Sequence, residues 1–173
     1  MTDHAIVESP LQFITAVEAL ADSPDAVIHW RDDATGMLAF MDAYRPQWLP
    51  AGVRVRPGLP DRGLAIDGRL LLGDVCSGRI QKQLADVYLA RHLPQVVILD
   101  DGLSTVAVVR QLMQGSGPVR RPRSAVSPLR LPLSAFVSAR LRGLARKGRL
   151  TWFTALVPIR RCVRGSRSRG SCS

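Results

Sequence analysis

The sequence has few residues of the kinds that form metal sites or disulfide frameworks. Its 173 residues include three cysteines and three histidines, widely separated and without a C-x-x-C pair. This scarcity argues against a disulfide-stapled domain or a zinc site. No apolar run approaches the roughly 20 residues of a membrane-spanning helix, and the opening MTDHAIVESP lacks the basic and apolar segments of a secretory signal. We therefore expect a cytoplasmic protein with no metal or other cofactor.

Acidic residues are missing from the last part of the chain. All 14 Asp and Glu residues lie in the first 101 residues beside nine basic ones, whereas residues 102–173 hold 15 basic residues and no acid. The net charge of +10 therefore divides into −5 for the first part and +15 for the second. Such asymmetry is typical of a basic tail that contacts nucleic acid or an acidic membrane surface.

Apolar periodicity predicts strands that alternate with helices. The expected strands cover 4–8, 26–30, 52–56, 69–73, 95–99 and 149–156, and the expected helices cover 10–21, 34–45, 77–92, 103–113 and 133–147. Strands separated by helices of this length indicate βαβ units. We predict an α/β fold with a Rossmann-like parallel sheet flanked by helices, in which residues 95–99 form a central strand.

Composition also predicts how the chain is divided. Residues 1–113 form the Rossmann-like domain, and residues 114–132 are a linker rich in Pro, Gly and Arg. Residues 133–156 add one helix and one strand. Residues 157–173 are a low-complexity basic tail that we expect to be irregular and disordered.

Polar residues cluster where three expected strands end, which is where parallel sheets bind ligands. The clusters are Glu8-Ser9-Pro10, Gly73-Asp74 through Ser77-Gly78, and Asp100-Asp101-Gly102. Asp100 and Asp101 directly follow a buried strand, and repulsion between their two carboxylates raises the pKa of one of them. Such a carboxylate can act as a general base toward a sugar hydroxyl, whereas the alternative is an ordinary acidic turn that caps a helix.

The segment from Gly73 to Gly78 places two glycines around an expected helix start, where free N–H groups favour anions. It has the G-x-x-x-x-G spacing of a P-loop, but Arg79-Ile80 replaces the required Lys and Ser/Thr. A phosphate or sugar contact and a plain capped turn both stay open. No G-x-G-x-x-G and no G-x-S-x-G occurs, which argues against a dinucleotide dehydrogenase and a serine hydrolase.

The three clusters together resemble the N-terminal half of bacterial sialyltransferases and polysialyltransferase-like glycosyltransferases. The resemblance covers roughly residues 4–113 and is carried by IVESPLQFITAVEAL at 6–20, LLLGDVCSGRIQKQL at 70–84 and VVILDDGLST at 96–105. It implies one domain of a two-domain architecture, which transfers a sugar from a CMP-sugar donor to a hydroxyl of a glycan acceptor.

The resemblance also implies roles for particular residues. Asp100 becomes the base that deprotonates the acceptor, and Asp101 orients it or exchanges roles with it. The residues expected to contact substrate on the acceptor side are Ser9, Gln12, Gly73, Asp74, Ser77 and Gly102. The family's His-Pro element, which contacts the donor phosphate, has no counterpart here. We therefore expect a truncated chain that alone turns over little or nothing.

The alternative is a non-catalytic α/β binding module. Its basic tail would contact nucleic acid or an anionic membrane, which would place the protein at the membrane periphery. Composition favours this interpretation, whereas the placement of the motifs favours the transferase. No aromatic residues are interleaved with the arginines, and no known nucleic-acid module is present.

Overall fold

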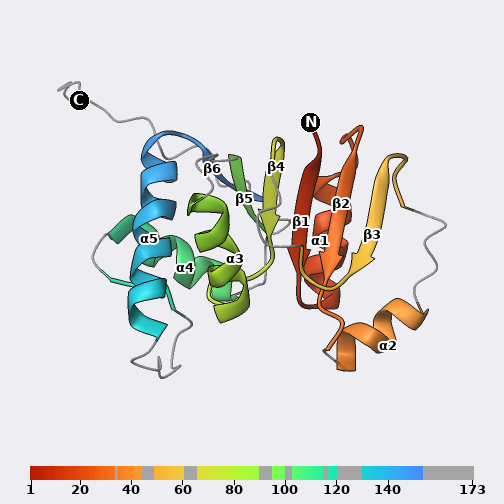
Figure 1. The fold of residues 1–173 in the computed structure, drawn as a ribbon, viewed down its shortest axis with the longest axis horizontal. Helices are drawn as coiled ribbons and strands as arrows, with labels where there is room; N and C mark the ends of the chain where they lie inside the picture. The colour runs from red at the N-terminus through yellow and green to blue at the C-terminus, as the bar shows by residue number, and fades with distance from the viewer. Residues whose placement is uncertain are drawn as a thin grey trace, which may run out of the picture.

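The computed structural model is a six-stranded sheet in which all strand pairs are parallel (Figure 1). It describes residues 1–33, 35–43, 49–60, 66–89, 95–99, 103–114, 117–120 and 130–153. The strands are β1 (Asp3–Val7), β2 (Ala26–Trp30), β3 (Val53–Pro57), β4 (Arg69–Leu72), β5 (Gln95–Leu99) and β6 (Leu150–Phe153). The helices are α1 (Pro10–Ala19), α2 (Thr35–Ala43), α3 (Gly78–Leu89), α4 (Leu103–Gln114) and α5 (Leu131–Arg146). The predicted α/β, Rossmann-like arrangement is thus confirmed.

The strand order is β3-β2-β1-β4-β5-β6, which places β1 and β4 in the middle of the sheet. The strand predicted at 95–99, β5, lies inside the sheet and pairs with β4 and β6, but it is not one of the two middle strands. Parallel strands that are covered on both faces all appear in the sequence as short apolar runs. The sequence therefore does not show which of them lie in the middle of the sheet. The strand expected at 52–56 is an edge strand, as its alternating pattern indicates.

Two apolar cores fill the two faces of the sheet, because successive side chains of a strand point to opposite sides. On one face Ile6, Leu72 and Ile98 pack with side chains of α3, α4 and α5. On the other face Val7 and Leu99 pack with side chains of α1 and α2. The loops that connect strands to helices therefore leave the sheet toward both faces, and this determines the geometry of the site described below.

The segment that follows α4 joins the same structure. β6 pairs with β5, and Val137, Leu141 and Leu144 of α5 are buried. The helix begins at Leu131, two residues before the predicted start, because a proline is favourable in the first turn of a helix. Within the expected linker, the backbone of Val119 is held to α5, since its N–H donates to Ser138 Oγ at 2.8 Å.

The predicted basic tail, 157–173, lies outside the described residues. None of the helices that the structure describes combines the length and the apolar character needed to cross a membrane.

Candidate functional site

The sheet changes its direction of growth between its two middle strands. After β1 the chain adds β2 and β3 on one side, and after β4 it adds β5 and β6 on the other side. The chain therefore leaves the carboxyl ends of β1 and β4 toward opposite faces, toward α1 and α3 respectively. In doubly wound sheets this switch point is where ligands bind. The first residues beyond the two strands are Glu8 and Gly73, which belong to two of the polar clusters.

Ser9 and Pro10 start α1. Ser9 has an extended backbone, and its Oγ accepts the N–H of Gln12 at 3.3 Å, while Pro10 occupies the first turn, where no N–H is needed. Ser9 is therefore the N-cap of α1. The capped turn directs the side chain of Gln12 back toward the end of β1.

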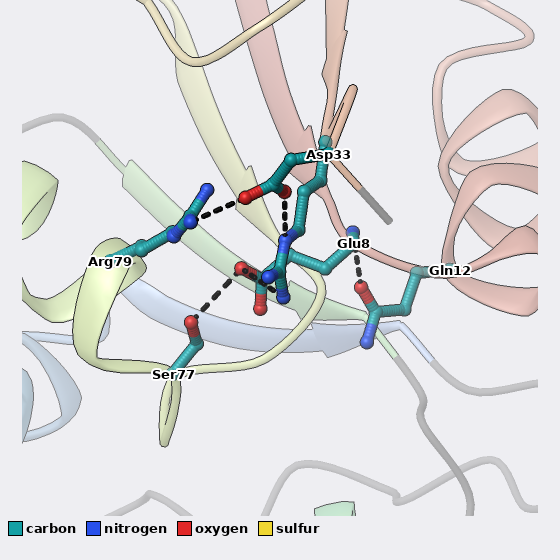
Figure 2. Close-up of polar contacts among 6 residues, drawn as sticks. Glu8, Gln12, Asp33, Ser77 and Arg79 are labelled. Carbon is teal, nitrogen blue, oxygen red and sulfur yellow. Dashed lines mark hydrogen bonds and ion pairs between the residues drawn. The ribbon is translucent and has the colours of Figure 1, made fainter. Parts of the chain in front are cut away.

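Gln12 joins the first two clusters. Its side chain is 2% exposed, and its Oε1 accepts the N–H of Glu8 at 2.8 Å (Figure 2). On its other side lies Gly73, where a Cβ atom would come within 2.5 Å of Gln12 Cδ. Gly73 also donates its N–H to the carbonyl of Ile6 at 3.0 Å. The glycine is therefore needed for the close contact between the loops after β1 and β4.

Glu8 and Ser77 form a second link between the same loops. Ser77 Oγ donates to Glu8 Oε1 at 3.0 Å, across 69 residues of sequence (Figure 2). Arg31, which follows β2, approaches the same carboxylate oxygen, with its Nη1 at 3.9 Å. The Glu8 side chain is only 9% exposed, so it lies at the inner end of the site. Its carboxylate and the Ser77 hydroxyl can orient sugar hydroxyls by hydrogen bonding.

Two arginines meet at Asp33 on the outer side of the site. Arg31 Nε and Arg79 Nη2 both donate to the Asp33 carboxylate, the latter at 2.5 Å (Figure 2). The hydrogen bond from Arg31, with a smaller contribution from Arg79, holds the pKa of Asp33 below its usual value. The same contact raises the pKa of Arg31. Asp33 therefore stays ionised at neutral pH and fixes the two guanidinium groups.

Asp74 shapes the loop that precedes α3. Its side chain is buried, and its Oδ1 accepts the N–H of Cys76 at 2.8 Å, while its carbonyl accepts the N–H of Ser77 at 3.1 Å. This is the arrangement of an Asx turn. Asp74 therefore holds the loop in which Ser77 lies. The substrate contact that the resemblance implies for Asp74 stays a prediction.

Asp100, Asp101 and Gly102 lie outside the described residues. β5 ends at Leu99, and because it is parallel to β4 its carboxyl end lies at the same edge of the sheet as those of β1 and β4. The roles expected of Asp100, Asp101 and Gly102 stay predictions.

A pocket of about 450 Å³ opens beside Ser77. Its lining is mostly basic and consists of Arg31, Ser77, Gly78, Arg79, Lys82, Arg130 and Leu133. Sequence reasoning missed its cations as site residues. Arg31 directly follows a strand, and Arg79 follows the two-glycine segment, so the position of each was a usable signal. The sequence contains no such signal for Arg130, because its contribution to the pocket depends on how α5 packs. Among the described residues, no group of three or more His, Cys, Asp or Glu side chains could hold a metal ion.

No protein-family model, curated protein or solved structure matches the chain significantly.

Proposed function

We propose that this chain is the acceptor-side domain of a sialyltransferase-like glycosyltransferase. The proposal rests on the direct contacts between two of the segments that carry the resemblance, 6–20 and 70–84, at the switch point of the sheet. Gln12 packs on Gly73, and Ser77 donates to Glu8, although the two segments are far apart in sequence. The third segment leaves β5 at the same edge of the sheet.

In this proposal Asp100 accepts the proton of the acceptor hydroxyl. The acceptor oxygen then forms a bond to the anomeric carbon of the donor sugar, and the bond from that carbon to CMP breaks in the same step, which inverts the configuration. Ser77 and Glu8 hold neighbouring hydroxyls of the glycan acceptor. Gln12 and Gly73 keep the two loops in register. Binding of the CMP-sugar donor is assigned to a second domain.

The test separates acceptor binding from transfer. Binding of oligosaccharides by the chain is measured by saturation-transfer NMR, and CMP-sugar transfer is measured for a version that carries a donor-binding half. Asp100→Ala should lower transfer by about 10²–10⁴-fold, the usual contribution of a general base, and should leave glycan binding intact. Ser77→Ala should weaken glycan binding, whereas Thr151→Ala, which removes an exposed hydroxyl from β6, should not.

Two results would contradict the proposal. If the chain binds no oligosaccharide, its assignment as an acceptor domain fails. If the Asp100→Ala enzyme keeps full transfer activity, the assignment of the base fails.

A second candidate function is supported by the charge of the chain end. The absence of any acid from residues 102–173 favours a module that contacts nucleic acid or an anionic membrane. The test is binding to RNA and to anionic vesicles at rising salt, before and after removal of residues 154–173. Truncation there preserves α5 and β6, which belong to the sheet and its core. Binding that survives the truncation would exclude the tail as the contact.

A further inference from the structure

We propose that the basic pocket beside Ser77 binds the phosphate group of a phosphorylated small molecule of about hexose size. This inference goes beyond the proposed transfer and does not depend on it. The cations that line the pocket come from three separate elements of the fold, which converge there. Arg31 follows β2, Arg79 and Lys82 lie in the first turns of α3, and Arg130 directly precedes α5.

The start of α3 supplies one side of the pocket. Arg79 and Lys82 are three residues apart, a spacing that places two side chains on the same face of a helix. The first hydrogen bond of the helix runs from the N–H of Gln81 to the carbonyl of Ser77. The N–H groups of the intervening residues therefore have no acceptor within the helix, and such groups favour an anion.

Arg130 supplies the opposite side. A Cβ atom on Gly78 would lie 3.0 Å from Arg130 Nη1, so this guanidinium group already lies against the first residue of α3. Gly78 is a pocket residue itself, and its lack of a side chain leaves room for this approach. An anion bound at the start of α3 could accept hydrogen bonds from the guanidinium group of Arg130 and from the backbone N–H groups of α3.

The balance of charge indicates a dianion. Four cations line the pocket, and two carboxylates are paired with them: Asp33 with Arg31 and Arg79, and Glu8 with Arg31. Within the part of the chain that the structure describes, neither Lys82 nor Arg130 forms an ion pair. Among the described residues two positive charges are thus left, which a phosphate monoester matches and a single carboxylate does not. Guanidinium groups also bind phosphate oxygens in pairs.

The pocket is large enough for more than the phosphate. A volume of about 450 Å³ lies within the range of small-molecule sites. Leu133 adds an apolar wall, and the Ser77 hydroxyl can bond to a sugar hydroxyl. A hexose phosphate fits these groups, with its phosphate between α3 and Arg130.

The experiment compares ligands that share a sugar ring and differ in charge. Isothermal titration of the full chain would use glucose 6-phosphate, glucuronate, glucose and inorganic phosphate. We expect glucose 6-phosphate to bind at least about tenfold more tightly than glucuronate, because the dianion gains more from the same cations. Glucose should not bind measurably. Inorganic phosphate should compete with glucose 6-phosphate but bind more weakly than it, because it lacks the sugar.

Variants identify the pocket as the binding site. Lys82→Gln and Arg130→Gln should each weaken binding of glucose 6-phosphate by about five- to tenfold, because both side chains are exposed and screened by water. The matched controls are Arg146→Gln and Lys147→Gln at the opposite end of α5, about 24 Å from Arg130 at the helical rise of 1.5 Å per residue. The controls should bind like the unmodified chain.

Asp33→Asn should act in the opposite direction. It removes the carboxylate that competes for Arg31 and Arg79, so glucose 6-phosphate should bind about two- to fivefold more tightly. A folding defect cannot produce such a gain. The proposal is overturned if glucuronate binds as tightly as glucose 6-phosphate, if the control variants lose as much affinity as the pocket variants, or if Asp33→Asn weakens binding. Failure of oligosaccharide binding with these results intact would overturn only the transferase proposal.

Discussion

The two ends of the same three strands, β1, β2 and β4, carry very different polar networks. At their amino ends the buried Asp3 is paired with Arg69, and at their carboxyl ends the cations outnumber the carboxylates around a pocket among the residues that the structure describes. Both ends contain arginine, aspartate and serine. The difference shows that the partners of a charged side chain, and not its residue type, decide whether it stabilises the fold or is available to a ligand.

The amino-end network is centred on Asp3. This residue is 8% exposed, and one of its oxygens accepts hydrogen bonds from Ser23 Oγ at 2.6 Å and from Arg69 Nη2 at 2.7 Å. The other oxygen accepts the backbone N–H of Arg69 at 2.6 Å. Burial by itself would raise the pKa of Asp3, but the hydrogen bonds from Arg69 and Ser23 outweigh it and lower the pKa. Every group here has a partner inside the protein, so we assign this end a role in stability.

The largest loss of stability is expected when the hydrogen bonds of Asp3 at the amino end are removed. Asp3→Asn removes charge-assisted hydrogen bonds at a buried position, and it should lower the free energy of unfolding by about 2–3 kcal/mol at pH 7. Urea denaturation measures this loss. Asp25→Asn, at a more exposed position of the same end, should change stability little. Equal losses in the two variants would mean that burial of Asp3 does not matter.

The effect of Asp3→Asn should also depend on pH. The pKa of Asp3 is lower in the folded state than in the unfolded state, so its contribution is present above the unfolded value of about 4 and is lost as pH falls through the folded value. The difference in stability between Asp3→Asn and the unmodified chain should therefore shrink below about pH 4. A constant difference over this range would contradict the ion-pair account.

The next effect concerns the link between the two loops of the candidate site. Gly73→Ala forces the buried Gln12 side chain to move, which should cost about 1–3 kcal/mol by overpacking. It should also weaken ligand binding at this end. Adding Gln12→Ala in the same chain should recover part of the stability, because the two residues are in direct contact. Additive losses in the double variant would show that the two residues do not clash.

A smaller effect is expected from the hydrogen bond between Ser77 and Glu8. Ser77→Ala leaves the core intact and removes one half-buried hydrogen bond, so the free energy of unfolding should fall by about 1 kcal/mol. Thermal denaturation measures this change. Binding at the carboxyl end should suffer more than stability does. A loss of stability as large as that of Asp3→Asn would remove the contrast between the two ends.

The smallest effect is expected from His4, which stacks on His29 near the amino ends, with Nδ1 of His4 and Nε2 of His29 3.3 Å apart. Burial lowers the pKa of His4, although the nearby aspartates oppose this. The unfolded chain therefore takes up a proton first as the pH falls below about 6.5, so stability should decline from there toward the folded pKa. Urea denaturation at pH 7 and pH 5 measures the decline, and His4→Gln should reduce it. An unchanged slope in that variant would assign the decline to other groups.

The fold could be predicted largely from the sequence, because it follows from local patterns. The strands at 26–30 and 95–99 match in their bounds, and the amphipathic pattern of α3 and the Ser9-Pro10 cap mark helices that the structure contains. The order of strands could not be predicted in full, since β1, β4 and β5 each contain a similar short apolar run. It depends on which neighbours pair, and that information is not local.

The candidate site could be predicted only in part for the same reason. The carboxyl end of each strand identifies the segments around Glu8, Gly73 and Ser77, because position along a parallel strand determines the edge. The convergence of Arg31, Arg79 and Arg130 requires the loops after β2 and β4 and the start of α5 to meet. No pattern of residue spacing in the sequence predicts that these three segments lie together.

The most direct test of the contrast between the two ends is a map of backbone amide chemical shifts during titration of the labelled chain with glucose 6-phosphate. We predict saturable shifts at the carboxyl end, centred on Arg31 and on residues 77–82, with those of Asp3 and Arg69 unchanged. Shifts centred on the amino ends of the strands, or spread evenly over all exposed arginines, would contradict the assignment of ligand binding to the carboxyl end.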